Sequence, residues 1–192
     1  MRREVARGNA PSGHPLPFLE IGTIAAPHGV RGELSCNLSC DGPDFFRQFA
    51  VLYWDTAGKQ PVTVRSARPH KGRILLRLEG IDTVEAANAL RGRTLYFRRS
   101  DAHLAEGAYF LTDLLGCEVR DAVSGEVYGT LTDVTQAGNA NQVWRIRRSE
   151  PLHGAAEFLM PAVREFIGEM HPEEGYVTIR PIPGLLEGGL EV

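Results

Sequence analysis

Short segments in which apolar residues recur at every second position run through most of the chain. The clearest lies at residues 33–38, where Leu34, Cys36 and Leu38 alternate with polar residues. A period of two is typical of a β-strand with one face in a core and the other in water. In the first half of the chain this pattern, bounded by turn residues, predicts strands at 18–26, 33–38, 51–54, 61–68, 74–78 and 94–98.

Two short helices are predicted between these strands. The first begins near Pro43, because proline is well tolerated in the first turn of a helix, and its apolar face consists of Phe45, Phe46 and Phe49. The second begins at Asp82, which with Glu85 has the spacing of a capping box, and it ends at Gly92. Several short strands with so little helix predict a small closed barrel, since closure removes the exposed edges of a sheet.

The second half of the chain has the same character. Strands are predicted at 115–120, 127–134, 143–146, 157–160 and 176–180, with a polar loop at 136–142, a short apolar segment at 163–167 and a turn at 183–186. A length of 192 residues accommodates one large domain or two small ones. The predicted fold class is mainly β with two small β-barrels: a disordered extension at 1–17, a first barrel at 18–98, a short linker at 99–106 and a second barrel domain at 107–192.

An adjacent aromatic pair, Tyr109 and Phe110, opens the second domain. Neighbouring side chains of a strand point to opposite faces, so one small core does not take both rings. Two interpretations remain open. Either one ring fills a core while the other lies under the linker, or the pair marks a domain junction where at least one ring contacts a partner, as interface aromatics often do.

The net charge of −3 conceals a division between the two halves of the chain. Residues 1–104 contain 15 Lys and Arg against 10 Asp and Glu, a net charge of +5, whereas residues 105–192 contain 6 against 14, a net charge of −8. A chain with one basic and one acidic half suits a polyanion and a basic protein together. Uneven solvation of surface charge is the alternative explanation.

The cysteine content and the lengths of the apolar runs indicate the cellular compartment. Cys36, Cys40 and Cys117 are odd in number and lack CxxC spacing, which argues against a disulfide framework or structural zinc and fits a reducing cytoplasm. No apolar run approaches the ~20 residues that cross a bilayer, and residues 1–17 lack the apolar core of a secretory signal. We therefore expect a cytoplasmic protein with no membrane segment, no metal and no cofactor.

Catalytic signatures are missing from the sequence. It contains no GxxxxGK[ST], HExxH or GxSxG motif. Glu118 and Asp133 are expected to be strand-face charges and not an acid–base pair. His28 stands in a glycine-rich loop, where it is expected to bond the loop or face a partner. We therefore expect that the protein is not an enzyme.

The strongest chemical signal is a basic tract in the first half. From Lys59 to Arg99 there are ten Lys and Arg, against only Glu79, Asp82 and Glu85. Such cations contact nucleic-acid phosphates without reading base identity. A solvated barrel surface is the alternative. Arg65, Arg73 and Arg77 lie on predicted strands and all have odd numbers, so they suit one face of a sheet. The predicted RNA-binding set is Arg65, Lys71, Arg73 and Arg77.

Four segments resemble the ribosome maturation factor RimM family. They are IGTIAAPHGVRGEL at 21–34, GAYF followed by TDLLG within 107–116, FLMPAV at 158–163 and PIPGLLE at 181–187. The segments occur in order and in both halves of the chain, so the resemblance is specific. It implies a translation-factor-type barrel followed by a PRC barrel.

The resemblance also implies a role and a set of partners. The family consists of assembly factors, not enzymes, for the head of the small (30S) ribosomal subunit, where they assist processing of 16S rRNA and maturation of its 3′ domain. They contact the small-subunit ribosomal protein numbered nineteen. Two adjacent tyrosines that matter for subunit binding correspond to Tyr109 and Phe110, the second without its hydroxyl. His28 and Arg31, in the first signature, complete the predicted partner-binding set, and a monomer is expected. Gln142 receives no role, because the family usually has an acidic residue there.

Two other classes of function remain open. One is a protein-interaction module that makes no contact with RNA. The other is a small-molecule-binding barrel, which requires a ligand-sized apolar cavity.

Overall fold

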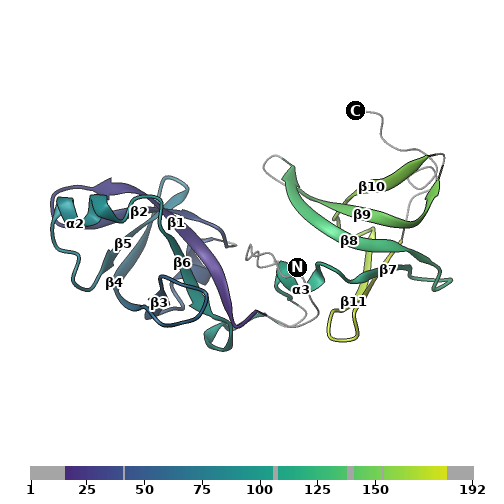
Figure 1. The fold of residues 1–192 in the computed structure, drawn as a ribbon, viewed down its shortest axis with the longest axis horizontal. Coiled ribbons are helices and arrows are strands. Elements are labelled where there is room, and N and C mark those ends of the chain that lie inside the picture. Colours follow the sequence, from purple (N-terminus) through teal and green to yellow (C-terminus); the bar gives the residue numbers. More distant parts are fainter. Residues whose placement is uncertain (1–15, 41, 106–107, 138–140, 153, 181–192) are drawn as a thin grey trace. The chain divides into compact units, whose positions relative to one another are not determined.

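The computed structural model describes residues 16–40, 42–105, 108–137, 141–152 and 154–180. The chain divides into two compact units between Thr112 and Asp113, and both units consist mainly of β-strands (Figure 1). The predicted fold class is confirmed in this respect. No helix in the described ranges has the length and apolar character of a membrane span. The predicted turn at 183–186 and nearly all of the predicted extension at 1–17 lie outside the described residues.

The first unit is a closed barrel of antiparallel strands in the order β1-β2-β5-β4-β3-β6. Every one of these strands is predicted from the sequence to within two residues at each end. Their bounds are β1 (Phe18–His28), β2 (Glu33–Leu38), β3 (Val51–Tyr53), β4 (Pro61–His70), β5 (Arg73–Leu78) and β6 (Thr94–Arg98).

Strand β1 closes the barrel because it pairs with β2 along one edge and with β6 along the other. Register shifts in both pairings mark bulges, which let a long strand bend between two partners. Gly22 lies at the most crowded point. A Cβ atom there would lie 2.4 Å from the carbonyl oxygen of Asn37 and 2.8 Å from Sγ of Cys36. The close approach of β2 to β1 therefore requires glycine at this position.

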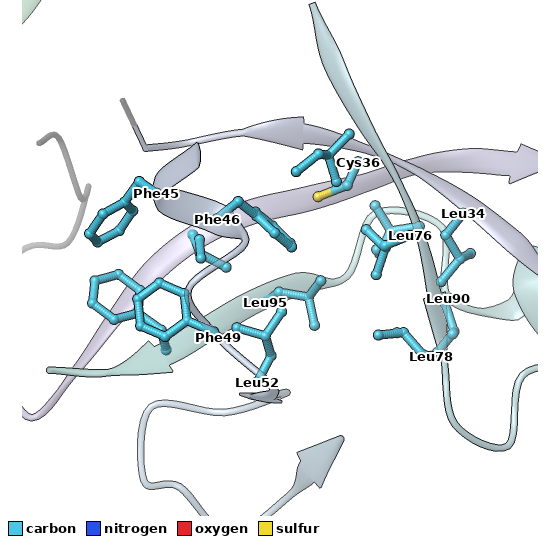
Figure 2. Close-up of a cluster of buried hydrophobic side chains, with 14 of the residues drawn as sticks. Leu34, Cys36, Phe45, Phe46, Phe49, Leu52, Leu76, Leu78, Leu90 and Leu95 are labelled. Carbon is cyan, nitrogen blue, oxygen red and sulfur yellow. The ribbon is translucent and has the colours of Figure 1, made fainter. Parts of the chain in front are cut away.

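Side chains fill the interior of the first barrel. The predicted helix is observed as α1 (Pro43–Phe46), only one turn long, and all three predicted phenylalanines are at most 4% exposed. A small barrel is just wide enough inside for side chains, so this packing does not favour a small-molecule site in the first unit. The residues packed together in Figure 2 include Leu34, Cys36, Phe45, Phe46, Phe49, Leu52, Leu76, Leu78, Leu90 and Leu95.

The second helix, α2 (Val84–Ala89), packs against β1 and β2. Its N-cap is Thr83, whose Oγ1 accepts a hydrogen bond from the backbone N–H of Ala86 at 3.2 Å. The predicted N-cap, Asp82, is therefore wrong by one residue, because both residue types cap helices well and adjacent candidates are hard to separate from sequence. The side chain of Asp82 instead faces two arginines.

The second unit is a six-stranded sheet in the order β10-β9-β8-β7-β12-β11. Strands β7 and β12 are parallel, and the other neighbours are antiparallel. The bounds are β7 (Glu118–Asp121), β8 (Val127–Ala137), β9 (Asn141–Leu152), β10 (Ala155–Pro161), β11 (Ile167–His171) and β12 (Tyr176–Ile179). Its buried side chains include Val119, Leu131, Trp144, Ile146, Phe158, Met160, Val177 and Ile179.

Two predictions for the second unit need correction. The predicted polar loop at 136–142 is strand at its described residues, since Gln136 pairs with Gln142 and Ala137 with Asn141, and its middle, 138–140, lies outside the described residues. Strand β11 was not predicted. Its buried residues Ile167 and Met170 are three positions apart, because the register with β12 shifts between them, and this hides the period of two.

Candidate nucleic-acid and partner interface

Strands β2, β5 and β4 are neighbours in the first barrel. The core takes the even-numbered residues of β5, so Arg73, Leu75 and Arg77 lie on the opposite, outer face. Directly across from them on β4 stand His70, Arg68 and Ser66. We use the name outer face for the surface made by Glu33, Arg65, Ser66, Arg68, His70, Arg73, Leu75 and Arg77.

A β-bulge in β4 decides which cations the outer face carries. The register with β5 shifts between Val64 and Ser66. Val64 and Ala67 both pack against the core, so Arg65 and Ser66 between them are directed to the outer face. Beyond the bulge the alternation changes parity. Arg68 therefore joins the outer face, although its even number separated it from the predicted set.

Arg65 and Arg77 meet at one carboxylate. Nη1 of Arg65 lies 3.2 Å from Oδ1 of Asp82, and Nη2 of Arg77 lies 3.7 Å from the same oxygen. Nη2 of Arg65 is also 4.0 Å from a carboxylate oxygen of Glu79. Exposed pairs of this kind contribute at most about 1 kcal/mol each. Their chief effect is to offset charge, because the two positive arginines stand beside two negative carboxylates.

A second ion pair crosses β5. Arg68 donates two hydrogen bonds to the carboxylate of Glu33, from Nε at 3.1 Å and from Nη2 at 2.9 Å. Because β5 lies between β4 and β2, the pair passes over Leu75, which is 1% exposed although it points away from the core. A bidentate arginine–carboxylate pair has well-defined geometry. Sequence reasoning missed this pair, since the two residues are far apart in the chain.

His28 stands at the end of β1 and not within the predicted loop. Its Nε2 lies 4.0 Å from Oε2 of Glu33, and its ring centroid lies 5.4 Å from that of His70. His70 in turn is opposite Arg73 in the β4–β5 ladder. The structure therefore joins His28 to the basic tract, through a second histidine that the sequence did not single out.

The β4–β5 turn carries two of the predicted RNA-binding residues. Its central residues, Lys71 and Gly72, have φ angles of 47° and 76°. Positive φ at both positions is the signature of a tight type I′ hairpin turn. Lys71 and the following Arg73 are exposed, and among the described residues neither has an ion-pair partner.

Arg31 occupies the β1–β2 turn and has an exposed side chain. Its carbonyl oxygen accepts a hydrogen bond from Nη2 of Arg77 at 3.4 Å. The neighbouring Val30 is 81% exposed. The turn is thus connected to β5 through its backbone, while the Arg31 side chain points into solvent.

Phe110 belongs to the core of the first unit. It is 3% exposed, its ring centroid lies 5.8 Å from that of Phe97, and Cζ of Arg99 lies 4.7 Å from the ring. Tyr109 is only partly buried, and it makes no hydrogen bond or ring contact with any described residue. Of the two interpretations of the pair, the core one applies to Phe110, and Tyr109 is the ring that retains exposed surface.

The aromatic pair does not lie on a strand. It is irregular chain between a 3₁₀ turn, η1 (Arg99–Asp101), and α3 (Leu111–Leu114). The division between the two units falls after the pair, at Thr112. The first unit therefore extends beyond the predicted linker at 99–106.

Paired charges mark the sheet of the second unit. Arg145 lies 3.2 Å from Glu157 and 4.0 Å from Asp133, and so connects β8, β9 and β10. Arg120 pairs with Glu118, and its Cζ lies 4.4 Å from the ring centroid of Tyr176. Glu118 and Asp133 are therefore strand-face charges, as expected, each paired with an arginine.

One cluster in the described part of the chain has metal-ligand types close together. Side-chain donors of His171, Glu173 and Glu174 lie within 4.8 Å of one another. The histidine already has partners: Nε2 lies 3.3 Å from Glu169, Nδ1 lies 3.6 Å from Glu174, and the ring stacks on Tyr176 at 4.8 Å. These contacts explain the cluster as a network of polar side chains on a turn.

The buried thiols are poor nucleophiles. Burial raises the pKa of Cys36 to about 12 and that of Cys117 to about 11. The reactive form of cysteine is the thiolate, which is scarce near neutral pH at such values. These two residues therefore serve packing.

Comparison with known proteins agrees with the resemblance in the sequence. Residues 19–102 match the RimM N-terminal domain and residues 106–186 match the PRC-barrel domain. A ribosome maturation factor RimM of Exiguobacterium sp. is 31% identical over 175 residues, which cover 90% of this chain and 98% of that protein. The RimM of Oleidesulfovibrio alaskensis is 33% identical over 171 residues, covering 88% and 95%.

Among solved structures, a RimM protein of Pseudomonas aeruginosa matches 86% of this chain and 98% of its own, with a TM-score of 0.38 and 21% identity. Members of the family are maturation factors and not enzymes. With both domains matched in order and relatives at 30% identity or more matched nearly end to end, the chain belongs to the ribosome maturation factor RimM family.

Proposed function

We propose that this protein binds the head of the immature small ribosomal subunit and assists processing of 16S rRNA and maturation of its 3′ domain. The first unit contacts the RNA. The second unit contacts the basic small-subunit ribosomal protein numbered nineteen. The protein acts in the cytoplasm, as a monomer and without a cofactor.

Family membership carries this proposal, and the division of charge supports the assignment of roles. The half that contains the first barrel has a net charge of +5, which suits RNA phosphates. The other half has a net charge of −8, which suits a strongly basic protein. A module that binds only protein has no need of a basic barrel, so the charge division favours two contacts of different kinds.

Four side chains of the first unit are proposed to take part in binding the small subunit: Tyr109, Phe110, His28 and Arg31. Their surroundings suggest different roles. Tyr109 and Arg31 offer exposed surface for direct contact, whereas Phe110 is 3% exposed and supports Tyr109 from within the core. His28 lies at the edge of the basic outer face, beside Glu33 and His70.

The proposed mechanism is a shift of population. An assembly factor that binds the immature arrangement of RNA and protein more tightly than the mature one holds that arrangement in place until the head closes. Release follows when closure removes the preferred surface. The required property is a difference in affinity between the two states, and not a chemical step.

Co-sedimentation with purified subunits tests the proposal. We expect the protein to sediment with immature small subunits and much less with mature ones. Tyr109→Ala should weaken this binding, whereas Val123→Ala, at a 92% exposed position of the second unit, should not. Equal sedimentation with both kinds of subunit would contradict a role tied to maturation.

A further inference from the structure

We infer that the β4–β5 hairpin tip and the adjacent histidine pair form the phosphate-binding site for RNA, while Arg65 and Arg77 serve the fold of the outer face. We call Lys71, Arg73, His28 and His70 the tip site. This inference rests on the proposed RNA contact and divides the four predicted RNA-binding residues into two groups with different functions.

The pairing of charges separates the two groups. Arg65 and Arg77 stand with Asp82 and Glu79 in one cluster, whose formal charges sum to zero. A phosphate that approaches them meets two carboxylates as well. Lys71 and Arg73 are exposed and, within the described chain, have no acidic partner, so they present a charge of +2 to an incoming polyanion. Uncompensated cations release counterions from RNA on binding, and this drives association.

The backbone fixes the positions of the tip cations. Lys71 and Gly72 both have positive φ, so the strands are joined by a two-residue turn with little freedom. His70 and Arg73 flank the turn as a cross-strand pair, which places their side chains on one face. A preorganised site loses less conformational entropy on binding than a flexible loop does.

The histidine pair extends the tip site along the outer face. The rings of His28 and His70 are 5.4 Å apart at an angle of 55°. The charged groups that face them are Glu33 from β2, Arg68 from β4 and Arg73 from β5. Because Arg68 makes two hydrogen bonds to Glu33, that carboxylate is already occupied and does not cancel the charge at the tip. An imidazole N–H donates a hydrogen bond to a phosphate oxygen, so the two rings add donors beside the tip cations.

A matched pair of double variants tests the division. K71Q/R73Q and R65Q/R77Q each remove two positive charges from the full-length protein. The probe is a transcript of the 3′ domain of 16S rRNA, and the measured quantity is the slope of log affinity against log salt. The tip variant should reduce the slope by about 1.4 to 1.8, since each of the two lost phosphate contacts accounts for about 0.7 to 0.9. The control variant should reduce it by less than half as much, while thermal melts show whether it destabilises the first unit.

Substitution of both histidines tests the histidine pair. H28Q/H70Q should weaken binding of the transcript, whereas the control H171Q, in the second unit, should leave the affinity unchanged. If R65Q/R77Q reduces the slope as much as K71Q/R73Q, or if H28Q/H70Q binds the transcript as tightly as the wild type, the assignment of the tip site is wrong, although the protein still contacts RNA. If the wild-type protein does not bind the transcript at all, the proposed RNA contact itself fails.

Discussion

Phe110 packs against Phe97 with ring centroids 5.8 Å apart, and both rings belong to the core of the first barrel. The neighbouring Tyr109 remains partly exposed. One short irregular segment therefore contributes an anchor to a core and, at the preceding position, a ring that remains partly exposed. The two residues have separable roles, although they are adjacent and chemically similar.

This separation predicts different effects for two single substitutions. Phe110→Ala should lower the free energy of unfolding by about 3 to 5 kcal/mol, as truncation of a buried phenylalanine usually does. Tyr109→Ala should change stability by less than about 1 kcal/mol and should instead weaken binding to immature subunits by about 2 kcal/mol if it is an interface anchor. Denaturant titration and co-sedimentation of both variants measure these effects. Equal loss of stability in the two variants would show that both rings serve the core.

The strands of the first barrel could be predicted because their side chains alternate between the core and the outer surface, which gives the apolar residues a period of two. In β5, the core residues Ile74, Leu76 and Leu78 make the alternation visible. Strand β11 shows the limit. A register shift between Ile167 and Met170 breaks the period, and no local pattern then distinguishes the strand from a loop. Bulges follow from contacts with a neighbouring strand, and these contacts are distant in the sequence.

The same limit applies to the site. The basic tract was visible as composition, but the partners of its arginines depend on the fold. Arg68 reaches the outer face only because of the bulge near Val64. It reaches Glu33 because β5 is the one strand that lies between β4 and β2. Asp82 pairs with both Arg65 and Arg77 because α2 is capped by Thr83, which leaves the aspartate side chain outside the helix.

Gly22→Ala should destabilise the first barrel. The added Cβ atom would lie 2.4 Å from a backbone carbonyl oxygen of β2, and backbone atoms in a ladder move only with the strand. Overpacking of this kind typically costs about 1 to 3 kcal/mol. Thr23→Ala, at the next and less buried position, serves as the control. An unchanged melting temperature for Gly22→Ala would mean that β1 and β2 separate more easily than the register suggests.

Asp121 should confer acid-sensitive stability on the β7–β8 hairpin. Its carboxylate accepts hydrogen bonds from the backbone N–H of Ser124 and Val123 and from the hydroxyl of Tyr128, which lowers the pKa of Asp121 from 3.8 to about 2. Because the folded state holds the proton less tightly than the unfolded state, the charged carboxylate stabilises the fold above about pH 4. That contribution is lost as the pH falls towards 2.

Asp121→Asn measures this contribution, since asparagine keeps an acceptor oxygen but carries no charge. The melting temperature of the variant should lie below that of the wild type at pH 6, and the difference should shrink between pH 4 and pH 2.5. Glu126→Gln removes one charge from the same hairpin and should show no such convergence. A constant difference between wild type and Asp121→Asn across this range would contradict the role of the carboxylate.

The three cysteines should react with a thiol reagent in two classes. Burial raises the pKa of Cys36 to about 12 and that of Cys117 to about 11, so few thiolates form at pH 8, and both side chains are also at most 4% exposed. Cys40 is partly exposed. In the native protein one thiol should react in the fast phase, and the other two should react only as the chain unfolds. Cys40→Ser should abolish the fast phase and leave the slow phase at the rate of global unfolding.

A fast phase that persists in Cys40→Ser would reveal local opening of the β1–β2 pair, where Cys36 lies against Gly22, or of the turn before β7, where Cys117 lies. Repeating the measurement with Gly22→Ala distinguishes these sites, because only Cys36 is packed against the added methyl group.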